Sequence, residues 1–62
     1  MSGVMQRTLA ILERLAAQVP GVPLATLADE LDIPRSAMHR LLMELAELGY
    51  VRQSRELGDY VL

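Results

Sequence analysis

Two short amphipathic segments joined by only two residues constrain the fold more than any other feature of this chain. Residues 24–31 place apolar side chains at i, i+3, i+4 and i+7, and residues 34–48 also gather theirs on one helical face. Only Asp32 and Ile33 separate the two, and Pro34 suits the first position of the next helix, where its missing N–H costs nothing. Asp32 is expected either to cap that helix or to adopt the left-handed conformation that ends the previous one. So tight a connection sets two helices at a steep angle and exposes one flank of the second.

A longer apolar pattern precedes this pair. Residues 4–19 predict a helix whose apolar side chains fill a sector of roughly 160°, wider than one core contact requires. Either this helix is deeply buried, or part of its stripe meets a second chain. Pro20, Gly21 and Pro23 are expected to end it and to impose a loop.

After the third predicted helix the pattern becomes extended. Gly49 suits the residue just past a helix end, and residues 50–53 and 60–62 are short β-prone segments around a polar stretch. The order helix, helix, tight turn, helix, hairpin predicts a mainly α fold with a small β-hairpin. This is a winged helix-turn-helix of three helices plus a two-stranded wing, occupying residues 1–62 as one domain.

Length and composition narrow the classes of function. A chain of 62 residues without cysteine has no disulfide or thiolate metal site to reinforce it, so oligomerisation or attachment to a larger protein is the remaining source of stability. Its apolar stretches are shorter than the about 20 residues that a bilayer requires. The N-terminal segment lacks the unbroken apolar core of a signal peptide. We therefore expect no membrane partner and a cytoplasmic location.

The formal net charge of −2 is unevenly distributed along the chain. Residues 1–34 and 56–62 are acidic, whereas residues 35–55 carry four arginines against two glutamates. All six basic side chains are arginines, whose planar donor forks suit phosphates and guanine edges. The acidic total argues mildly against a nucleic-acid partner, but the local distribution of charge matters more than the sum.

His39 is the only histidine, and the sequence offers little to build a catalytic or metal site around it. A metal would need two or three more ligands, and acid–base catalysis would need a partner within hydrogen-bond reach. Glu44 and Glu47 are not at the i+3 or i+4 spacing from His39 that a helical pair requires. The chain also has no glycine-rich phosphate loop. We therefore predict no catalytic residue, no metal, no cofactor and no enzymatic activity.

The outward flank of the third predicted helix favours contact with an anion instead. Arg35 and Ser36 occupy its first turn, where backbone amides and the helix dipole favour a phosphate. Arg40 can donate to guanine or phosphate, or it is a solvated side chain paired with Glu44 at i+4. His39 is expected either to hydrogen-bond a phosphate or to have a solvated or structural role.

Other side chains are assigned on the same basis. Arg52 and Arg55 flank the wing, either as phosphate contacts that add affinity without sequence information or as ordinary exposed arginines. Met43 is expected to be exposed, where it could touch a thymine methyl or a neighbouring loop. The inner face of the third helix is predicted to be core, at Leu41, Leu42, Leu45 and Leu48.

Three stretches resemble the N-terminal DNA-binding domain of the IclR family of bacterial transcriptional regulators. They are "RTLAILERLA", "LATLADELDIPRSAMHRLLMELAELGYV" and "GDYVL". The resemblance implies a homodimer or tetramer that binds double-stranded operator DNA. It also implies a C-terminal domain, absent from this chain, that binds a small-molecule effector. The wide apolar stripe of residues 4–19 indicates that helix 4–19 forms part of the contact between copies. The sequence departs from the family at Asp32, where a glycine is frequent, and at Ala37. There a small polar residue is frequent, so a DNA-facing position lacks one hydroxyl.

A winged helix used for protein contacts is the alternative, such as the dimerisation domain at the front of a small-molecule methyltransferase. The acidic total and the wide apolar stripe of residues 4–19 support it. A dimerisation module has no need, however, for polar and basic side chains on the flank of the third helix opposite the core. That flank favours DNA, with the helix of residues 34–48 in the major groove and the wing of residues 50–62 on the backbone.

Overall fold

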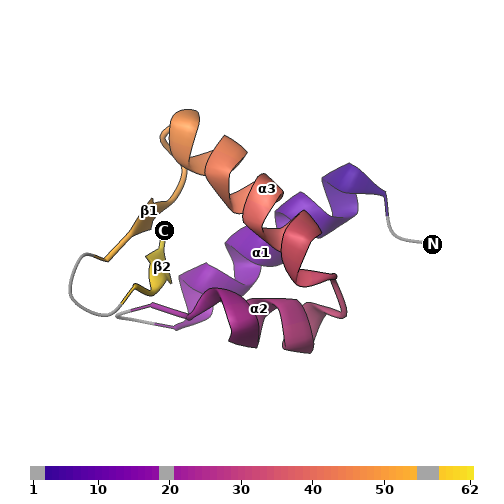
Figure 1. The fold of residues 1–62 in the computed structure, drawn as a ribbon. Coiled ribbons are helices and arrows are strands. Elements are labelled where there is room, and N and C mark those ends of the chain that lie inside the picture. The colour runs from indigo at the N-terminus through magenta and orange to yellow at the C-terminus, as the bar shows by residue number, and fades with distance from the viewer. Residues whose placement is uncertain (1–2, 19–20, 55–57) are drawn as a thin grey trace.

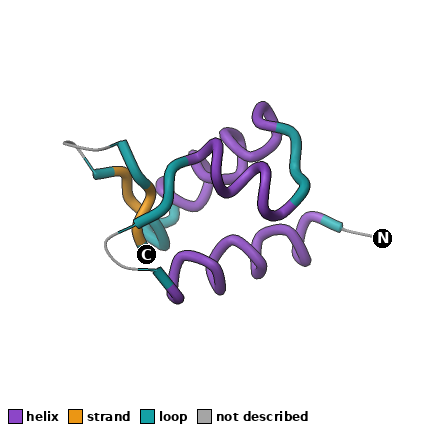
Figure 2. The backbone as a smooth tube through the Cα atoms, turned by 90° about the horizontal axis from the view of Figure 1, so that it is seen from below, coloured by secondary structure: helices purple, strands orange, loops and turns teal. Residues whose placement is uncertain are grey.

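The computed structural model describes residues 3–18, 21–54 and 58–62. Three helices, α1 (Val4–Ala17), α2 (Leu24–Leu31) and α3 (Arg35–Glu47), precede two short strands, β1 (Arg52–Gln53) and β2 (Tyr60–Val61). Figure 1 shows the helices crossing one another, with both strands at the end of the molecule away from the N-terminus. Figure 2 shows the same separation of hairpin and N-terminus after a quarter turn. The predicted fold class is confirmed.

The helix α1 is shorter than the pattern of residues 4–19 predicts. It ends at Ala17, and Gln18 already has an extended backbone (φ −131°, ψ 116°). At the other end, the backbone N–H of Gly3 donates to the side-chain oxygen of Gln6 at 3.2 Å. Val19 and Pro20 lie outside the described residues. In the part of the chain that the structure describes, no helix combines the length and apolar character needed to cross a membrane.

The turn between α2 and α3 takes one of the two expected forms. Asp32 is left-handed (φ 55°, ψ 48°), and the N–H of Ile33 donates to the carbonyl of Ala28 at 2.9 Å, which closes the end of α2. Aspartate tolerates this conformation better than most residues. Pro34 was predicted to be the first residue of α3, but it is the N-cap residue that precedes the helix, because its ψ of 143° is not helical. Its carbonyl accepts the first helical hydrogen bond, from Met38 at 2.9 Å.

The end of α3 follows the prediction for glycine. Gly49 has a positive φ of 87°, its N–H donates to the carbonyl of Ala46, and the N–H of Tyr50 donates to the carbonyl of Leu45. These two bonds satisfy carbonyl groups that the last turn of a helix otherwise leaves unpaired. The chain then reverses into β1.

The two strands pair antiparallel, with Arg52 opposite Val61 and Gln53 opposite Tyr60. A third segment, which the sequence does not predict, joins the far side of β2. Val22 and Tyr60 exchange backbone hydrogen bonds of 3.0 and 2.8 Å. The loop before α2 is thereby fixed to the wing.

One core holds these elements together. Its largest fully buried side chains come from all three helices and from the Val22 segment, and they are Ile11, Leu15, Leu27, Met38, Leu42 and Val22. Two predictions about this core are corrected. Leu48 is 65% exposed, because α3 ends at Glu47 and the chain turns away there. Leu41 is only partly buried, although it packs against the core.

Only part of the apolar stripe of α1 is buried in this core. Ile11 and Leu15 are buried, whereas Val4, Met5 and Leu9 are 70%, 75% and 54% exposed. Of the two alternatives for this wide stripe, deep burial is therefore wrong for this chain on its own. The exposed half of the stripe remains available to another surface.

Candidate nucleic-acid interface

The helix α3 has one face in the core and one face in solvent. Met38, Leu42 and Leu45 are buried. On the opposite side, the exposed residues of the first two turns are polar or basic, namely Arg35, Ser36, His39 and Arg40. At about 100° per residue these four occupy neighbouring positions on the outward half of the helix. The structure thus brings together four of the seven residues predicted to contact DNA.

The start of α3 is open to an approaching anion. Pro34 offers no N–H, no side chain caps this end, and the first turn has no acidic residue in the described structure. The backbone amides of the first turn and the positive end of the helix dipole therefore accompany the exposed Arg35 and Ser36. Arg35 has one close ionic contact, with Asp29 on α2, at 4.0 Å between Nη2 and Oδ2.

Arg40 and His39 lie one turn further along. Among the described residues, Arg40 has no carboxylate within 4.0 Å, so the pair with Glu44 is not formed. His39 is exposed beside it. In the same described part of the chain, no group of three or more histidine, cysteine, aspartate or glutamate side chains could hold a metal ion. The outward face therefore presents two guanidinium groups, an imidazole and a hydroxyl rather than a set of metal ligands.

The remaining predicted contacts lie apart from this face. Ala37 is partly buried and packs against the core, so its methyl group supports α3 as well as bordering the exposed face. Arg52 is exposed on β1, opposite Val61. Beside it, Gln53 donates from Nε2 to the carbonyl of Gly58 at 2.9 Å, which ties the two sides of the wing together. Arg55 lies outside the described residues.

Not every arginine is available to a partner. Arg14 on α1 donates from Nε to Oε1 of Glu30 at 2.7 Å and from Nη2 to Oε2 at 3.3 Å, a two-pronged contact between α1 and α2. It also donates to Gln18 at 2.7 Å. Arg14 therefore stabilises the packing of α1 against α2, which distinguishes it from Arg40.

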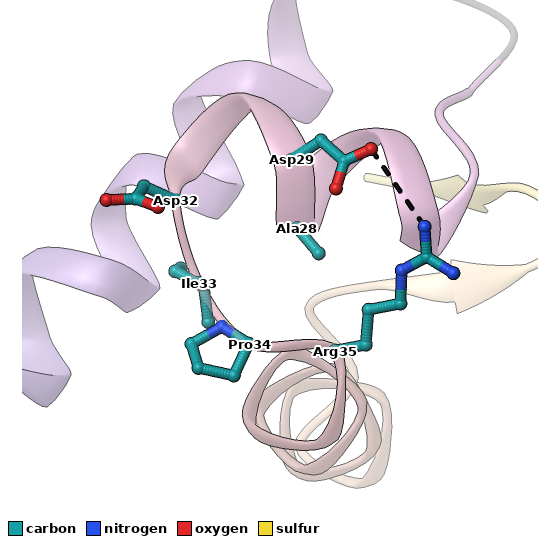
Figure 3. A pocket seen from close by; sticks show the side chains of 6 residues that line it. All are labelled: Ala28, Asp29, Asp32, Ile33, Pro34 and Arg35. Carbon is teal, nitrogen blue, oxygen red and sulfur yellow. Dashed lines mark ion pairs between the residues drawn. The ribbon is translucent and has the colours of Figure 1, made fainter.

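Asp29 is the residue at this site that sequence reasoning missed. It lies on α2, yet it lines the same surface hollow as Asp32, Pro34 and Arg35 (Figure 3). The signal was present in the tight turn, because a two-residue connection brings the last turn of α2 beside the first turn of α3. Periodicity alone assigns Asp29 to solvent, and it is indeed exposed.

Three helices, a tight turn between the second and third, and a two-stranded antiparallel hairpin define a winged helix-turn-helix domain. Within that class, residues 4–55 match the family described as the IclR helix-turn-helix domain. The chain belongs to this family.

Individual proteins and solved structures are also similar to this chain. The chain is 38% identical over 58 residues to the transcriptional repressor IclR of Escherichia coli, covering 94% of this chain and 21% of that protein. The crystal structure of Pseudomonas aeruginosa HmgR is similar with a TM-score of 0.82 and 31% identity, over 94% of this chain and 24% of that one. The Zalpha domain of Cyprinid Herpesvirus 3 ORF112, whose binding mode to Z-DNA was determined, has a TM-score of 0.83 and 26% identity over 98% of both chains. The chain thus spans about a fifth of the length of the IclR repressor.

Proposed function

We propose that this chain binds double-stranded DNA in a sequence-specific manner, as the DNA-reading domain of a transcriptional regulator in the cytoplasm. The observation that carries the proposal is the division of α3 into a buried apolar face and an exposed face with Arg35, Ser36, His39 and Arg40. A helix held in this way can enter a major groove and place its outward side chains against base edges. Its relative from Escherichia coli is a transcriptional repressor.

In this arrangement the side chains contact different parts of the DNA. The first turn of α3, with Arg35 and Ser36, engages a phosphate together with the free backbone amides. Arg40 donates to a guanine edge, where a good bidentate contact discriminates by about 1–3 kcal/mol. His39 hydrogen-bonds a phosphate. Arg52 and Arg55 on the wing bind the backbone, which adds affinity for any sequence.

Exposed apolar side chains at the start of α1 and the end of α3 support dimerisation. We call Val4, Met5, Leu9 and Leu48 the α1–α3 apolar surface; all four are more than half exposed. A small groove between the two helices is lined by Val4, Thr8, Leu41, Glu44, Leu45 and Leu48. In a dimer that buries this surface, we expect the two α3 helices to enter successive major grooves, about 34 Å apart. A small-molecule effector is expected to bind a further, C-terminal domain, for which the greater length of the relatives leaves room.

The alternative, a dimerisation module such as that of a methyltransferase, gains no support. The relatives named above do not include a methyltransferase. Such a module also gives no reason for the exposed Arg35, His39 and Arg40 on the flank of α3 opposite the core.

Salt-dependent DNA binding tests the proposal. A high-affinity duplex is first selected from a random pool with the protein, and its affinity is then measured from about 50 to about 200 mM salt. We expect the logarithm of the affinity to fall linearly with the logarithm of the salt concentration, with a slope of about −0.9 per phosphate neutralised. No enrichment from the pool, together with no affinity for DNA at the lowest salt, would refute the proposal and leave the protein-contact module in front.

A further inference from the structure

An ion pair joins the two helices of the helix-turn-helix beside the start of α3. Nη2 of Arg35 lies 4.0 Å from Oδ2 of Asp29 on α2. Figure 3 shows the two side chains reaching toward each other across the hollow that Ala28, Ile33 and Pro34 also line. The side chains of Arg35 and Asp29 are 68% and 73% exposed. Because both side chains are mostly in solvent, the ion pair is not part of the hydrophobic core.

We propose that Asp29 is a specificity-determining residue that orients Arg35 and limits its contact with unrelated DNA. The inference rests on the DNA-binding function proposed above. A guanidinium carries five N–H donors in a rigid fork. A carboxylate that holds one amino group from the side therefore leaves other donors free, while it restricts the positions that they reach.

The pair is strong enough to bias Arg35 and too weak to lock it. An exposed ion pair is worth about 0.2–1 kcal/mol, which corresponds to a population shift of up to about fivefold. With Asp29 present, Arg35 favours the one orientation set by α2, which suits the phosphate beside the first turn of α3 when the domain is in register on its operator, and contacts with phosphates elsewhere must break the pair. Without Asp29, the arginine is free to reach any nearby phosphate. Affinity for unrelated DNA should then rise more than affinity for the operator.

A second effect of Asp29 has to be separated from this one. Any carboxylate near the DNA repels phosphates, and that repulsion is the same for every sequence. Removing a negative charge therefore strengthens binding to operator and unrelated DNA by equal factors. Only the restraint on Arg35 changes the ratio of the two affinities.

Asp32 provides a matched control for the charge. It is exposed and lines the same hollow as Asp29, but among the described residues it forms no ion pair with Arg35. Its backbone is left-handed (φ 55°), a conformation that asparagine also tolerates. Asp32→Asn thus removes the same unit of charge from the same place without releasing Arg35.

The experiment compares affinities for the selected duplex and for an unrelated duplex of equal length, by fluorescence anisotropy at one salt concentration. Asp29→Asn is expected to lower the ratio of the two affinities by about 1.4- to fivefold, whereas Asp32→Asn raises both affinities and leaves the ratio unchanged. In an Arg35→Ala background, Asp29→Asn should no longer alter the ratio. Asp29→Glu keeps the carboxylate and should retain most of the wild-type ratio.

Three results would overturn the inference. The ratio could stay constant in Asp29→Asn, it could fall equally in Asp32→Asn, or its fall could persist without Arg35. Each would reduce Asp29 to a general source of negative charge. If the wild-type protein selects no duplex and binds no DNA, the proposed function itself fails. If the wild type selects a duplex but Asp29→Asn leaves the ratio of affinities unchanged, the inference about Asp29 fails while the proposed function stands.

Discussion

Gly21 lies so close to β2 that a Cβ added to it would stand 2.6 Å from Cγ1 of Val61. The same Cβ would lie 2.8 Å from the carbonyl oxygen of Tyr60. The next residue, Val22, exchanges two backbone hydrogen bonds with Tyr60. The missing side chain at residue 21 therefore allows the loop before α2 to pair with the wing.

Replacing Gly21 with alanine should destabilise the protein by about 1–3 kcal/mol, because a methyl group must be accommodated in space already occupied by side chain and backbone. Urea denaturation followed by circular dichroism measures this change in the free energy of unfolding. The rest of the fold should form, since the helices do not depend on this contact.

A double-mutant cycle with Val61→Ala provides the control. Removing Cγ1 of Val61 relieves the shortest contact, so the double variant should be more stable than the sum of the two single losses predicts. Rescue is expected to be incomplete because the Tyr60 carbonyl remains. Strict additivity would show that the Gly21 contact is not the cause.

The three helices were predictable because their signals are local. The spacing of apolar residues predicts the bounds of α2 correctly. The conformational freedom of Gly49 predicts where α3 ends, and its φ there is 87°. Pro34 marks the start of α3 to within one residue. Each of these signals depends on residues within a few positions of one another.

The errors come from contacts between distant parts of the chain. Val22 lies between a glycine and a proline, and nothing local indicates that it pairs with Tyr60. Leu48 has the periodicity of a core residue, yet the chain turns away before another element covers it. The pair of Asp29 and Arg35 likewise depends on the angle between two helices. The exposure of the outward residues of α3 was predicted correctly, because residues opposite an apolar stripe are identified by helical spacing alone.

The exposure of Leu48 predicts unequal costs for two leucines on α3. Leu42→Ala should destabilise the protein by about 2–5 kcal/mol, because Leu42 is fully buried. Leu48→Ala should cost under about 0.5 kcal/mol in the monomer, because its side chain is mostly in solvent. Chemical denaturation at low protein concentration measures both. Similar losses for the two variants would contradict the placement of Leu48.

Arg40 and Arg52 should differ in their effects on DNA binding. Arg40→Ala is expected to weaken binding to the selected duplex by about 1–3 kcal/mol and to relax the preference at one base pair, with a smaller effect on unrelated DNA. Arg52→Ala should weaken both equally and reduce the slope of the salt dependence by about 1. Anisotropy titrations over a range of salt concentrations distinguish the two. Equal losses on both duplexes for Arg40→Ala would make it a phosphate contact.

Self-association should depend on the α1–α3 apolar surface. Leu9→Glu places a charge where Leu9 is 54% exposed, so the monomer should fold while its burial against a second copy becomes unfavourable. Sedimentation velocity over a range of protein concentrations should show weaker association than for the wild type. Affinity for a two-site operator should fall with it, because each domain then binds separately.

Gln6→Glu is the matched control for this prediction. It introduces the same charge at a position that is already polar, about 60° around the exposed side of α1 from Leu9, and a carboxylate can still accept the hydrogen bond that the N–H of Gly3 donates to Gln6. This variant should associate and bind the two-site operator like the wild type. If Leu9→Glu associates as strongly as Gln6→Glu, the exposed half of the α1 stripe is not the dimer contact. Loss of association in both variants would instead point to net charge, since each adds one negative charge to a chain already at −2.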